Sequence, residues 1–560
     1  MTIPKHDYFF TTPLIESGIC LKIVLIGFMG TGKTVVGEQL ARRLGWPLLD
    51  VDWRIEEETG HTVREIFTTA GEEEFRRLEA AQVERLSRER DVVLTTGGGT
   101  VLNPDNVRRL REESLVVWLR TSPEELVRRL QGPELGSRPI LSGDASRIPQ
   151  LLAVREEFYR QAAHQVVNTS GRSPKEVAAA IIAGLPWPRT VRVELKERAY
   201  PIHIGYTLLA RVDEILGKLL EPRPTLLVTS KPLETMFGFQ VASRLNAAGW
   251  PIKMTTLPDG EAAKTLTEVE KLYGACLEAG LARDGLIIAL GGGTVGDAAG
   301  FAAATYLRGI EYIQLPTTLV AQTDASIGGK TGVNLPTGKN LVGSFHQPQA
   351  VVADTGVLAT LPERERKSGL AEVLKHGLLA SPTLVEFLED KPVEAASLKG
   401  PDIPWMIEEN CRIKATVVAE DERESGRRAF LNLGHTVGHA LETATGYTSY
   451  THGEAVAVGL VAASRISRRL GLLSTGDDER IGAILARLGL PIVLPPLTWD
   501  CLKEPLAKDK KIRQGKLRFV LLSRRSVLGG DDAGFEPMLR DDVPESLVRE
   551  VLIGLGARPD

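Results

Sequence analysis

Cysteine is scarce in this sequence, and its positions form no pattern. The 560-residue chain has four cysteines, Cys20, Cys276, Cys411 and Cys501. A disulfide framework or a thiolate zinc site would need closely spaced pairs. The scattered thiols argue against both and are typical of a protein of the reducing cytoplasm.

Long apolar runs and a strong net charge are also missing. No run approaches the ~18 apolar residues of a membrane span. The first twenty residues lack a basic stretch followed by an apolar core, so we expect a flexible leader at 1–20 rather than a signal peptide. The formal net charge of −4 gives no indication of a nucleic-acid surface. We therefore expect a soluble, cytoplasmic globular protein whose partners are small molecules.

Strand and helix patterns alternate along much of the chain. LKIVLIGFMGTGKTVVGEQLARRLG, DVVLTTGGG and SLVVWLRTS each begin with an apolar strand, which predicts a parallel α/β sheet. This series ends at GLPWPRT, and a second α/β series follows. Helical periodicity dominates after about residue 357. The regions we expect are a leader at 1–20, an α/β domain at 21–185, a linker at 186–190, an α/β part at 191–356 and a mostly α-helical part at 357–560.

A glycine-rich turn between the first strand and the first helix matches the motif G-x-x-x-x-G-K-[ST]. Its residues are Gly27, Gly30, Gly32, Lys33 and Thr34. In such a turn the backbone N–H groups face the phosphates of a nucleotide, the lysine reaches the β- and γ-phosphates, and the threonine hydroxyl binds Mg²⁺. The motif predicts a nucleotide site with magnesium.

Charged residues downstream are candidates for an acceptor site. Asp50 and Asp52 stand at the end of the next strand, where alternation would place both on one side. One can serve the magnesium ion and the other a substrate hydroxyl. The bare backbone at 97–99 allows a small ligand to approach closely. Arginines that can bind an anionic acceptor or the phosphates are Arg76, Arg138 and Arg155.

Together these motifs resemble the shikimate kinase family over residues 21–185. GFMGTGKT, DVD, EFRRLE, GGG, RPIL and REEFYR occur in the order and spacing of that family. The resemblance implies a P-loop kinase fold and ATP-dependent phosphorylation of shikimate to shikimate 3-phosphate. It implies that shikimate is held by Asp52, Arg76, Gly98 and Arg155, with the two arginines on its carboxylate. It assigns ATP to Gly30, Gly32, Lys33, Thr34, Arg129, Arg138 and Pro174, and Mg²⁺ to Thr34 and Asp50. Lys33 and Asp52 would be catalytic, and Asp52 would either orient or deprotonate the accepting hydroxyl.

Two histidines four residues apart lie in LNLGHTVGHALE. In a helix, His435 and His439 project from one face, but Thr436 stands where an H-E-x-x-H zinc motif has its glutamate. A catalytic zinc has three protein ligands, so the others are expected elsewhere. Candidates are His452 and Glu372, whose carboxylate would be costly to bury in an apolar helix without a partner or a metal.

Cations and amides are frequent around these candidates, which suits a phosphorylated and carboxylated substrate. They are Arg308, Lys330, Lys339, Asn340, Lys375, Lys414, Arg428 and Asn432. In addition, LGGGTVGD at 290–297 places a glycine triplet between a strand and a helix, where a pyrophosphate can bind. It departs from G-x-G-x-x-G and by pattern alone is a weak indication of NAD.

Residues 190–530 resemble the 3-dehydroquinate synthase family. The motifs are PDGEAAKTL, GGGTVGDAAGFAAATYLRG, LPTTLVAQTDASIGGKTGVN, GKNLVGSFHQP, SGLAEVLKHG, RRAFLNLGHTVGHALE, HGEAVAVG and DKK. The resemblance implies a Rossmann-like NAD part, a helical metal-binding part, and a divalent cation such as Zn²⁺ or Co²⁺. It implies conversion of 3-deoxy-D-arabino-heptulosonate 7-phosphate to 3-dehydroquinate plus phosphate, and a possible homodimer through this half.

The same resemblance assigns residues to roles. The metal ligands would be Glu372, His435 and His452, whereas His439 would lie near the substrate phosphate. The substrate would be held by Arg308, Asp324, Asn340, Lys375, Lys414, Arg428, Asn432 and His439. The catalytic groups would be Lys330, Lys375, Lys414, Arg428 and His439. NAD would be bound by Asp259, Glu261, Lys264, Gly293, Thr294, Val295, Gly296, Asp297, Thr317, Thr318, Lys330 and Lys339.

Two other functions remain open from the sequence. The second half could be a metal-dependent polyol dehydrogenase, although a neutral polyol needs no such set of cations. The first half could be a regulatory nucleotide-binding module without kinase activity, although its acceptor arginines disfavour this.

Overall fold

The chain folds as two compact units that divide between residues 188 and 189. The computed structural model describes residues 22–44, 46–89, 92–112, 114–130, 144–183, 189–398, 402–424, 426–507, 517–524 and 534–559. The expected leader, Arg138 and the DKK motif lie outside the described residues. The expected linker is described only at Arg189 and Thr190, which already belong to strand β6 (Arg189–Val193).

The first unit is built on a five-stranded parallel sheet with the order β2-β3-β1-β4-β5. Its strands are β1 (Lys22–Ile26), β2 (Leu48–Asp50), β3 (Val92–Thr95), β4 (Leu115–Arg120) and β5 (Gln165–Asn168). The central strands β1 and β3 are buried along their whole length, as expected for a sheet covered on both faces.

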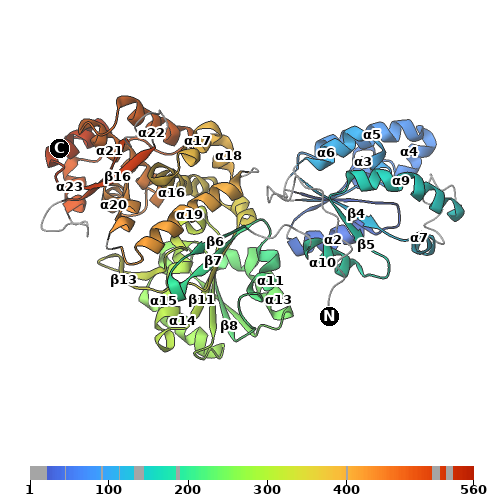
Figure 1. Cartoon of the computed structure of the whole chain (residues 1–560), viewed down its shortest axis with the longest axis horizontal. Helices are drawn as coiled ribbons and strands as arrows, with labels where there is room; N and C mark the ends of the chain where they lie inside the picture. Colours follow the sequence, from blue (N-terminus) through green and yellow to red (C-terminus); the bar gives the residue numbers. More distant parts are fainter. Residues whose placement is uncertain are drawn as a thin grey trace. The chain divides into compact units, whose positions relative to one another are not determined.

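Helices cover both faces of this sheet (Figure 1). They are α2 (Lys33–Leu44), α3 (Val51–Thr59), α4 (Val63–Thr69), α5 (Gly71–Leu86), α6 (Pro104–Arg111), α7 (Pro123–Arg129), α9 (Ile148–Ala162) and α10 (Pro174–Ala183). Helices α2 and α10 pack against each other, and α3 and α5 do the same. The loops at the carboxyl ends of β1, β2 and β3 therefore open on one edge of the sheet, where ligands of such sheets bind.

The second unit begins with a seven-stranded sheet in the order β6-β7-β14-β11-β10-β8-β9. Beyond the antiparallel pair of β6 with β7 (Tyr200–Gly205), its strands run parallel. They are β8 (Thr225–Ser230), β9 (Ile252–Leu257), β10 (Leu286–Gly291), β11 (Glu311–Pro316) and β14 (Ala350–Asp354). The flanking helices are α11 (Val212–Leu216), α13 (Phe239–Ala247), α14 (Leu266–Glu278) and α15 (Gly293–Thr305), and a hairpin of β12 (Lys330–Leu335) and β13 (Gly338–Phe345) packs on α15.

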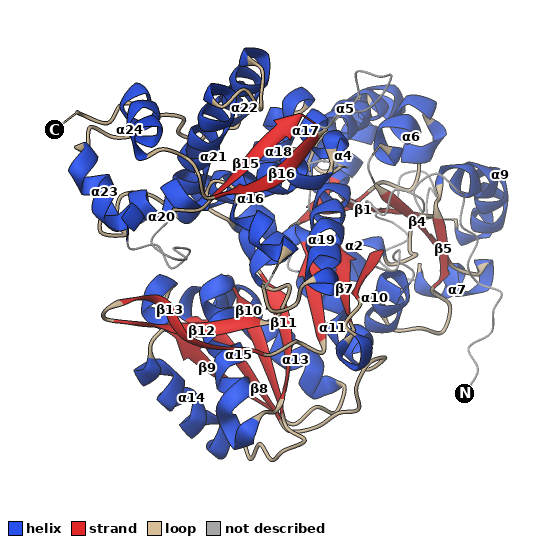
Figure 2. Cartoon of the chain, turned by 60° about the vertical axis from the view of Figure 1, so that its left-hand side comes forward, coloured by secondary structure: helices blue, strands red, loops and turns tan. Residues whose placement is uncertain are grey.

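Helices dominate the rest of the second unit (Figure 2). They are α16 (Glu363–Ala380), α17 (Pro382–Asp390), α18 (Pro392–Ser397), α19 (Ile403–Glu420), α20 (His435–Ala444), α21 (His452–Arg469), α22 (Thr475–Arg487), α23 (Trp499–Ala507) and α24 (Glu545–Gly554). The expected succession of α/β, α/β and mostly helical parts is confirmed. The helical periodicity gave no sign of the antiparallel hairpin β15 (Phe519–Arg524) and β16 (Phe535–Arg540).

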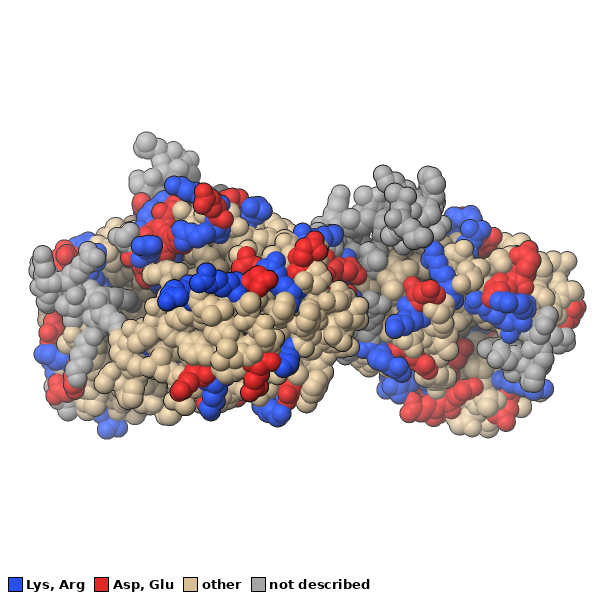
Figure 3. Space-filling model, turned by 90° about the horizontal axis from the view of Figure 1, so that it is seen from below, with Lys and Arg blue, Asp and Glu red and all other residues tan. Residues whose placement is uncertain are grey.

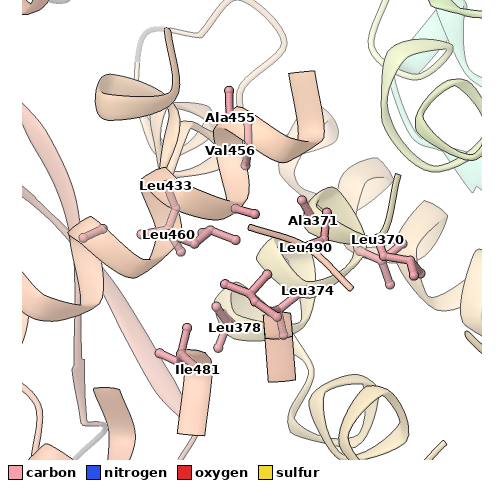
Figure 4. Packing of buried hydrophobic residues seen from close by; sticks show 14 of the residues in the cluster. Leu370, Ala371, Leu374, Leu378, Leu433, Ala455, Val456, Leu460, Ile481 and Leu490 are labelled. Atoms are coloured by element: carbon pink, nitrogen blue, oxygen red, sulfur yellow. The ribbon is translucent and has the colours of Figure 1, made fainter. Parts of the chain in front are cut away.

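One hydrophobic core joins the sheet edge and the helices of the second unit. It runs from Val191 and Ile202 in β6 and β7 to the buried faces of α16 and α21. Figure 4 shows Leu370, Leu374 and Leu378 of α16 pointing toward the other helices of this core. The two parts of the second unit therefore share a core, so a cut near residue 357 would expose apolar surface.

The face drawn in Figure 3 carries basic and acidic side chains in mixed clusters. Among the described residues, no helix combines the length and the apolar composition that crossing a membrane requires.

Candidate functional site

The glycine-rich turn of the first unit leads directly from β1 into α2. Gly30 and Gly32 adopt positive φ angles of 80° and 88°, which side-chain-bearing residues rarely adopt. Lys33 opens the helix, and its Nζ donates to the carbonyls of Gly27 and Phe28 at 2.9 and 3.1 Å. The ammonium group thus lies over the turn, where phosphates would meet it together with the N-terminus of α2.

Asp50 and Asp52 reach this site in a way the strand pattern did not predict. The expectation that both follow strand alternation is wrong, because α3 begins at Val51 and Asp52 lies in its first turn. Asp50 is the N-cap of α3, and its Oδ1 accepts from the backbone N–H of Asp52 at 3.0 Å. Its Oδ2 accepts from Thr34 Oγ1 at 3.2 Å and Thr95 Oγ1 at 2.6 Å. Thr34 and Asp50 are therefore placed together beside the turn.

The four residues expected to hold an acceptor meet around the glycines at 97–99. Arg155 is 5% exposed, and its Nη1 donates to the carbonyl of Gly98 at 3.2 Å. A β-carbon on Gly99 would lie 2.4 Å from Arg76 Nη2, and one on Gly97 would lie 3.1 Å from Asp52 Oδ1. The bare backbone therefore gives these side chains room to converge.

Two further residues of the first unit were expected near ATP. Arg129 lies beside the glycine-rich turn, since Nη1 is 3.5 Å from the carbonyl of Gly30 and Nη2 is 3.1 Å from that of Thr169. Pro174 is the first residue of α10, which packs on α2. Arg138 lies outside the described residues.

Sequence reasoning missed Glu79 in the first unit. This carboxylate is 1% exposed and accepts from Arg76 Nη1 at 2.8 Å and from Thr100 Oγ1 at 2.6 Å. It holds the guanidinium of Arg76 toward the glycines. The motif EFRRLE contains it, three residues after Arg76, which is the spacing of neighbours on one helix face.

In the second unit, Glu372, His435 and His452 form one cluster, called here the ligand cluster. Their ligand atoms all lie within 4.8 Å of one another. Glu372 Oε1 is 3.5 Å from His435 Nε2 and 3.3 Å from His452 Nε2. Two ligands each about 2.1 Å from a tetrahedral ion are about 3.4 Å apart, so the spacing fits a zinc-sized cation.

The burial of Glu372 also supports a cation at the ligand cluster. Its carboxylate is 0% exposed, and among the described residues neither oxygen accepts a hydrogen bond of good geometry. Lys375 forms an ion pair with it one turn along α16. Burial opposes its ionisation, but Lys375 and His435 hold the pKa of Glu372 well below its usual range. Burial also lowers the pKa of His435 well below its usual value, whereas Glu372 and Glu442 outweigh burial and raise the pKa of His452 to about 10. A metal that binds His452 would displace a proton from its ring.

Glycines bring the three helices of the ligand cluster close together. A β-carbon on Gly453 would lie 1.8 Å from the carbonyl oxygen of Ser368, and one on Gly459 equally close to that of Gly434. Helix α21 therefore touches α16 and the start of α20 backbone to backbone. The sequence carried this signal in HGEAVAVG, where one glycine directly follows the ligand histidine and another follows it after seven residues, but only the packing reveals their partners.

His439 lies beside the ligand cluster rather than within it. Its ring centroid is 5.3 Å from that of His435 and 6.2 Å from that of His452. The other histidines near this part of the sequence have structural partners. His376 contacts Asn410 at 3.0 Å, and His346 contacts the carbonyl of Ile310 at 2.8 Å.

Several of the residues expected at the substrate are held by ion pairs or hydrogen bonds. Lys414 pairs with Asp324, whose Oδ1 is also 3.7 Å from His376 Nε2. Burial lowers the pKa of Lys414 to about 8, although Asp324 opposes this shift. Lys330 pairs with Glu424, which also accepts from Asn432 Nδ2 at 3.0 Å. Arg428 is 1% exposed, and Nη2 donates to the carbonyl of Gly328 at 3.1 Å.

The residues expected to bind NAD gather at the N-terminus of α15 and beside it. Gly293 to Asp297 form the start of this helix after the buried strand β10. Thr317 N donates to the carbonyl of Gly291 at 3.0 Å, which places Thr317 and Thr318 next to the glycine triplet. Lys264 Nζ donates to Asp297 Oδ2 at 2.6 Å and to Asn340 Oδ1 at 2.5 Å.

Other members of the expected NAD set meet on the β12–β13 hairpin. Lys339 Nζ is 3.4 Å from Glu261 Oε1, and Glu261 accepts from Asn334 Nδ2 at 2.6 Å. Asp259 is exposed and directly precedes the 3-10 turn Gly260–Ala263, which contains Glu261. Asn340 was expected at the substrate, but it accepts a hydrogen bond from Lys264. It therefore lies among the residues expected to bind NAD.

Arg308 does not join these residues within one chain. It is exposed and lies past the C-terminal end of α15, whereas the glycine triplet is at the N-terminal end. At 1.5 Å per residue the two ends are about 20 Å apart. The glycine triplet and Arg308 belong to one sequence motif, GGGTVGDAAGFAAATYLRG, but helix α15 separates them.

Three family models match the chain. The model described as shikimate kinase matches residues 29–186. Those described as the N-terminal and C-terminal parts of 3-dehydroquinate synthase match residues 254–368 and 369–512. A 3-dehydroquinate synthase of Halorhodospira halophila is 51% identical over 335 residues, which are 60% of this chain and 93% of the relative.

Solved structures of two other synthases are also similar to about two thirds of this chain. A 2-deoxy-scyllo-inosose synthase, complexed with carbaglucose-6-phosphate, NAD⁺ and Co²⁺, is 28% identical with a TM-score of 0.56, over 65% of this chain and 99% of that chain. ValA, the 2-epi-5-epi-valiolone synthase of Streptomyces hygroscopicus subsp. jinggangensis 5008 with NAD⁺ and Zn²⁺ bound, is 27% identical with a TM-score of 0.58, over 65% and 98%.

These matches do not favour the polyol dehydrogenase or the regulatory module, since each unit corresponds to a known enzyme family. The chain therefore belongs to the 3-dehydroquinate synthase family and joins to it a shikimate kinase domain, so that it is a bifunctional enzyme of the shikimate pathway.

Proposed function

We propose that the first unit phosphorylates shikimate at the site formed by Asp52, Arg76, Gly98 and Arg155. Their convergence around the glycines at 97–99 supports this assignment. Arg76 and Arg155 offer two planar guanidinium groups to the shikimate carboxylate. Asp52, whose Oδ1 lies beside Gly97, accepts the proton of the attacking hydroxyl or orients it.

In this proposal the glycine-rich turn would hold the nucleotide. Lys33 would bind its β- and γ-phosphates, and Thr34 and Asp50 would hold Mg²⁺. Arg129, Arg138 and Pro174 complete the ATP site. Transfer of the phosphoryl group then depends mainly on positioning and on neutralisation of charge.

For the second unit we propose a divalent cation on Glu372, His435 and His452. The buried carboxylate and the ligand spacing support a Zn²⁺ or Co²⁺ ion. NAD is assigned to the triplet at the start of α15 and to Asp259, Glu261, Lys264, Lys330 and Lys339. When bound, the metal supplies Lewis acidity and NAD supplies reversible hydride transfer.

The chain's own residues bind and orient the heptulosonate phosphate. Lys375, Lys414 and Arg428 are buried cations whose carboxylate and carbonyl partners hold them in place. We assign them, with Asp324, Asn432 and His439, to the phosphate, the carboxylate and the hydroxyl groups of the substrate. Lys330 and His439 are the groups available to move protons at its ring.

We further propose the regions 21–185, 191–356 and 357–560 as kinase, NAD and metal-binding parts, and a cytoplasmic location. We also propose a homodimer through the second unit. The mass of the protein in solution, measured by light scattering, tests the dimer.

The ligand cluster is the observation that carries the proposal for the second unit. The test supplies each substrate to the purified protein and identifies the products by mass. We expect shikimate 3-phosphate from shikimate and ATP, and dehydroquinate with phosphate but no net NADH from the heptulosonate phosphate. Protein treated with a chelator and then dialysed should lose only the second activity and regain it with Zn²⁺ or Co²⁺. Net NADH production would contradict the synthase proposal.

A further inference from the structure

Glu442 is a buried carboxylate next to the ligand cluster that the assignments above do not use. It lies on α20, seven residues after His435 and therefore on the same face of the helix. It is 6% exposed. A carboxylate is seldom buried this deeply unless charged or hydrogen-bonded groups contact it.

Two such groups contact it, one at each oxygen. Glu442 Oε2 is 3.4 Å from Nδ1 of His452, the ring whose Nε2 is 3.3 Å from Glu372. Glu442 Oε1 is 3.9 Å from Nζ of Lys339 on β13. The carboxylate therefore lies behind a metal ligand, on the side away from Glu372.

This arrangement could instead be a second cation site, because His439, Glu442 and His452 also place their ligand atoms within 4.8 Å of one another. The chemistry of His452 argues against it. A neutral imidazole has a single nitrogen lone pair, so a ring that binds a metal through Nε2 carries a proton on Nδ1. The ammonium group of Lys339 beside Glu442 would also repel a second cation.

We propose that Glu442 is a positioning residue that accepts the Nδ1–H of His452 and so turns the Nε2 lone pair toward the metal. The inference rests on the proposed metal site. A carboxylate behind a ligand histidine fixes the tautomer and the orientation of the ring and makes it a stronger donor. Through Lys339, the same carboxylate links α20 to the hairpin assigned to NAD.

The experiment measures Zn²⁺ affinity of the full chain by competition with a chromophoric chelator. We expect Glu442→Gln, which keeps the size of the side chain, to raise the dissociation constant by about 10- to 100-fold. At saturating Co²⁺ the absorption spectrum should stay that of the wild type, because the three ligands are unchanged. Glu442→Asp shortens the side chain by one methylene and should also weaken Zn²⁺ binding. This variant replaces Glu442→Gln in the measurement if the glutamine variant does not fold.

Glu454→Gln is the matched control. Glu454 lies two residues after His452 on α21, pairs with Arg364 and closes the capping box of that helix, a role that glutamine can also fill. We expect its Zn²⁺ affinity to match the wild type.

The outcomes separate this inference from the metal site itself. If the wild type binds no metal, or if His435→Ala binds as tightly as the wild type, the proposed metal site fails. If these behave as expected but Glu442→Gln keeps wild-type affinity, Glu442 has no positioning role. A changed Co²⁺ spectrum in Glu442→Gln would show that Glu442 is itself a metal ligand. Equal weakening of Zn²⁺ binding in Glu454→Gln would show that loss of any nearby negative charge lowers the affinity. Either result overturns the inference.

Discussion

Replacing Arg155 by lysine tests whether the first unit recognises a carboxylate through a guanidinium group. Arg155 is 5% exposed on α9, and it donates to the carbonyl of Gly98 beside Asp52 and Arg76. Lysine keeps the positive charge but cannot form two parallel hydrogen bonds to one carboxylate. The fold should survive the change, because Tyr159 Oη also donates to the Gly98 carbonyl, at 2.5 Å.

The expected magnitude follows from the loss of one hydrogen bond to a charged group. Such a bond contributes about 1.5–3 kcal/mol, which corresponds to about 10- to 150-fold in affinity. The carboxylate is remote from the phosphoryl group that is transferred, so its binding is equal in the ground state and the transition state. The shikimate KM should therefore rise by that factor while kcat changes little.

The assay follows ADP release against shikimate concentration at saturating ATP, with thermal unfolding to check the fold. Arg160→Lys is the control, since Arg160 lies on the same helix but is 58% exposed and pairs with Glu157. Its KM should stay unchanged. An unchanged KM in folded Arg155→Lys would remove Arg155 from the site, and an equal rise in both variants would show only a general effect of an arginine-to-lysine change on this helix.

Four further outcomes are expected. Lys33→Ala should abolish shikimate phosphorylation and spare dehydroquinate formation, because the phosphate loop belongs to a separate unit; loss of both activities in a folded variant would contradict this. His435→Ala should lose the metal measured by atomic absorption, whereas His439→Ala should keep it, and equal depletion would refute the ligand assignment. The pKa of Lys414 is about 8, so its positive charge is lost as the pH rises through 8, and the KM for the heptulosonate phosphate should then rise. If Lys414→Met shows the same dependence of KM on pH, Lys414 is not its source. Chains ending near residue 185 and starting near residue 189 should each keep their own activity, and a loss of kcat/KM beyond about a hundredfold, or roughly 2.7 kcal/mol, in a folded half would show that the units are coupled.

Several features could be predicted because they depend on residues close together in the sequence. The glycine-rich turn, the helix after it and the alternation of strands and helices follow from backbone conformation and apolar periodicity over short stretches. The helical periodicity expected after about residue 357 corresponds to helices such as α16, α17, α19 and α21 for the same reason. The expectation that Asp52 continues the strand alternation was wrong, because Asp50 caps helix α3 and the chain is already helical at Val51.

What the sequence by itself determined is the kind of chemistry available: a phosphate loop, a glycine triplet after a strand, and histidines, a buried glutamate and lysines in one region. The tertiary structure decided which of these groups meet. Glu372, His435 and His452 come together because glycines let three helices touch, whereas Arg308 is carried to the far end of α15. The partners of Glu79 and Glu442 likewise appear only after folding, because the pairing of a buried charge depends on the packing of elements that are distant in the sequence.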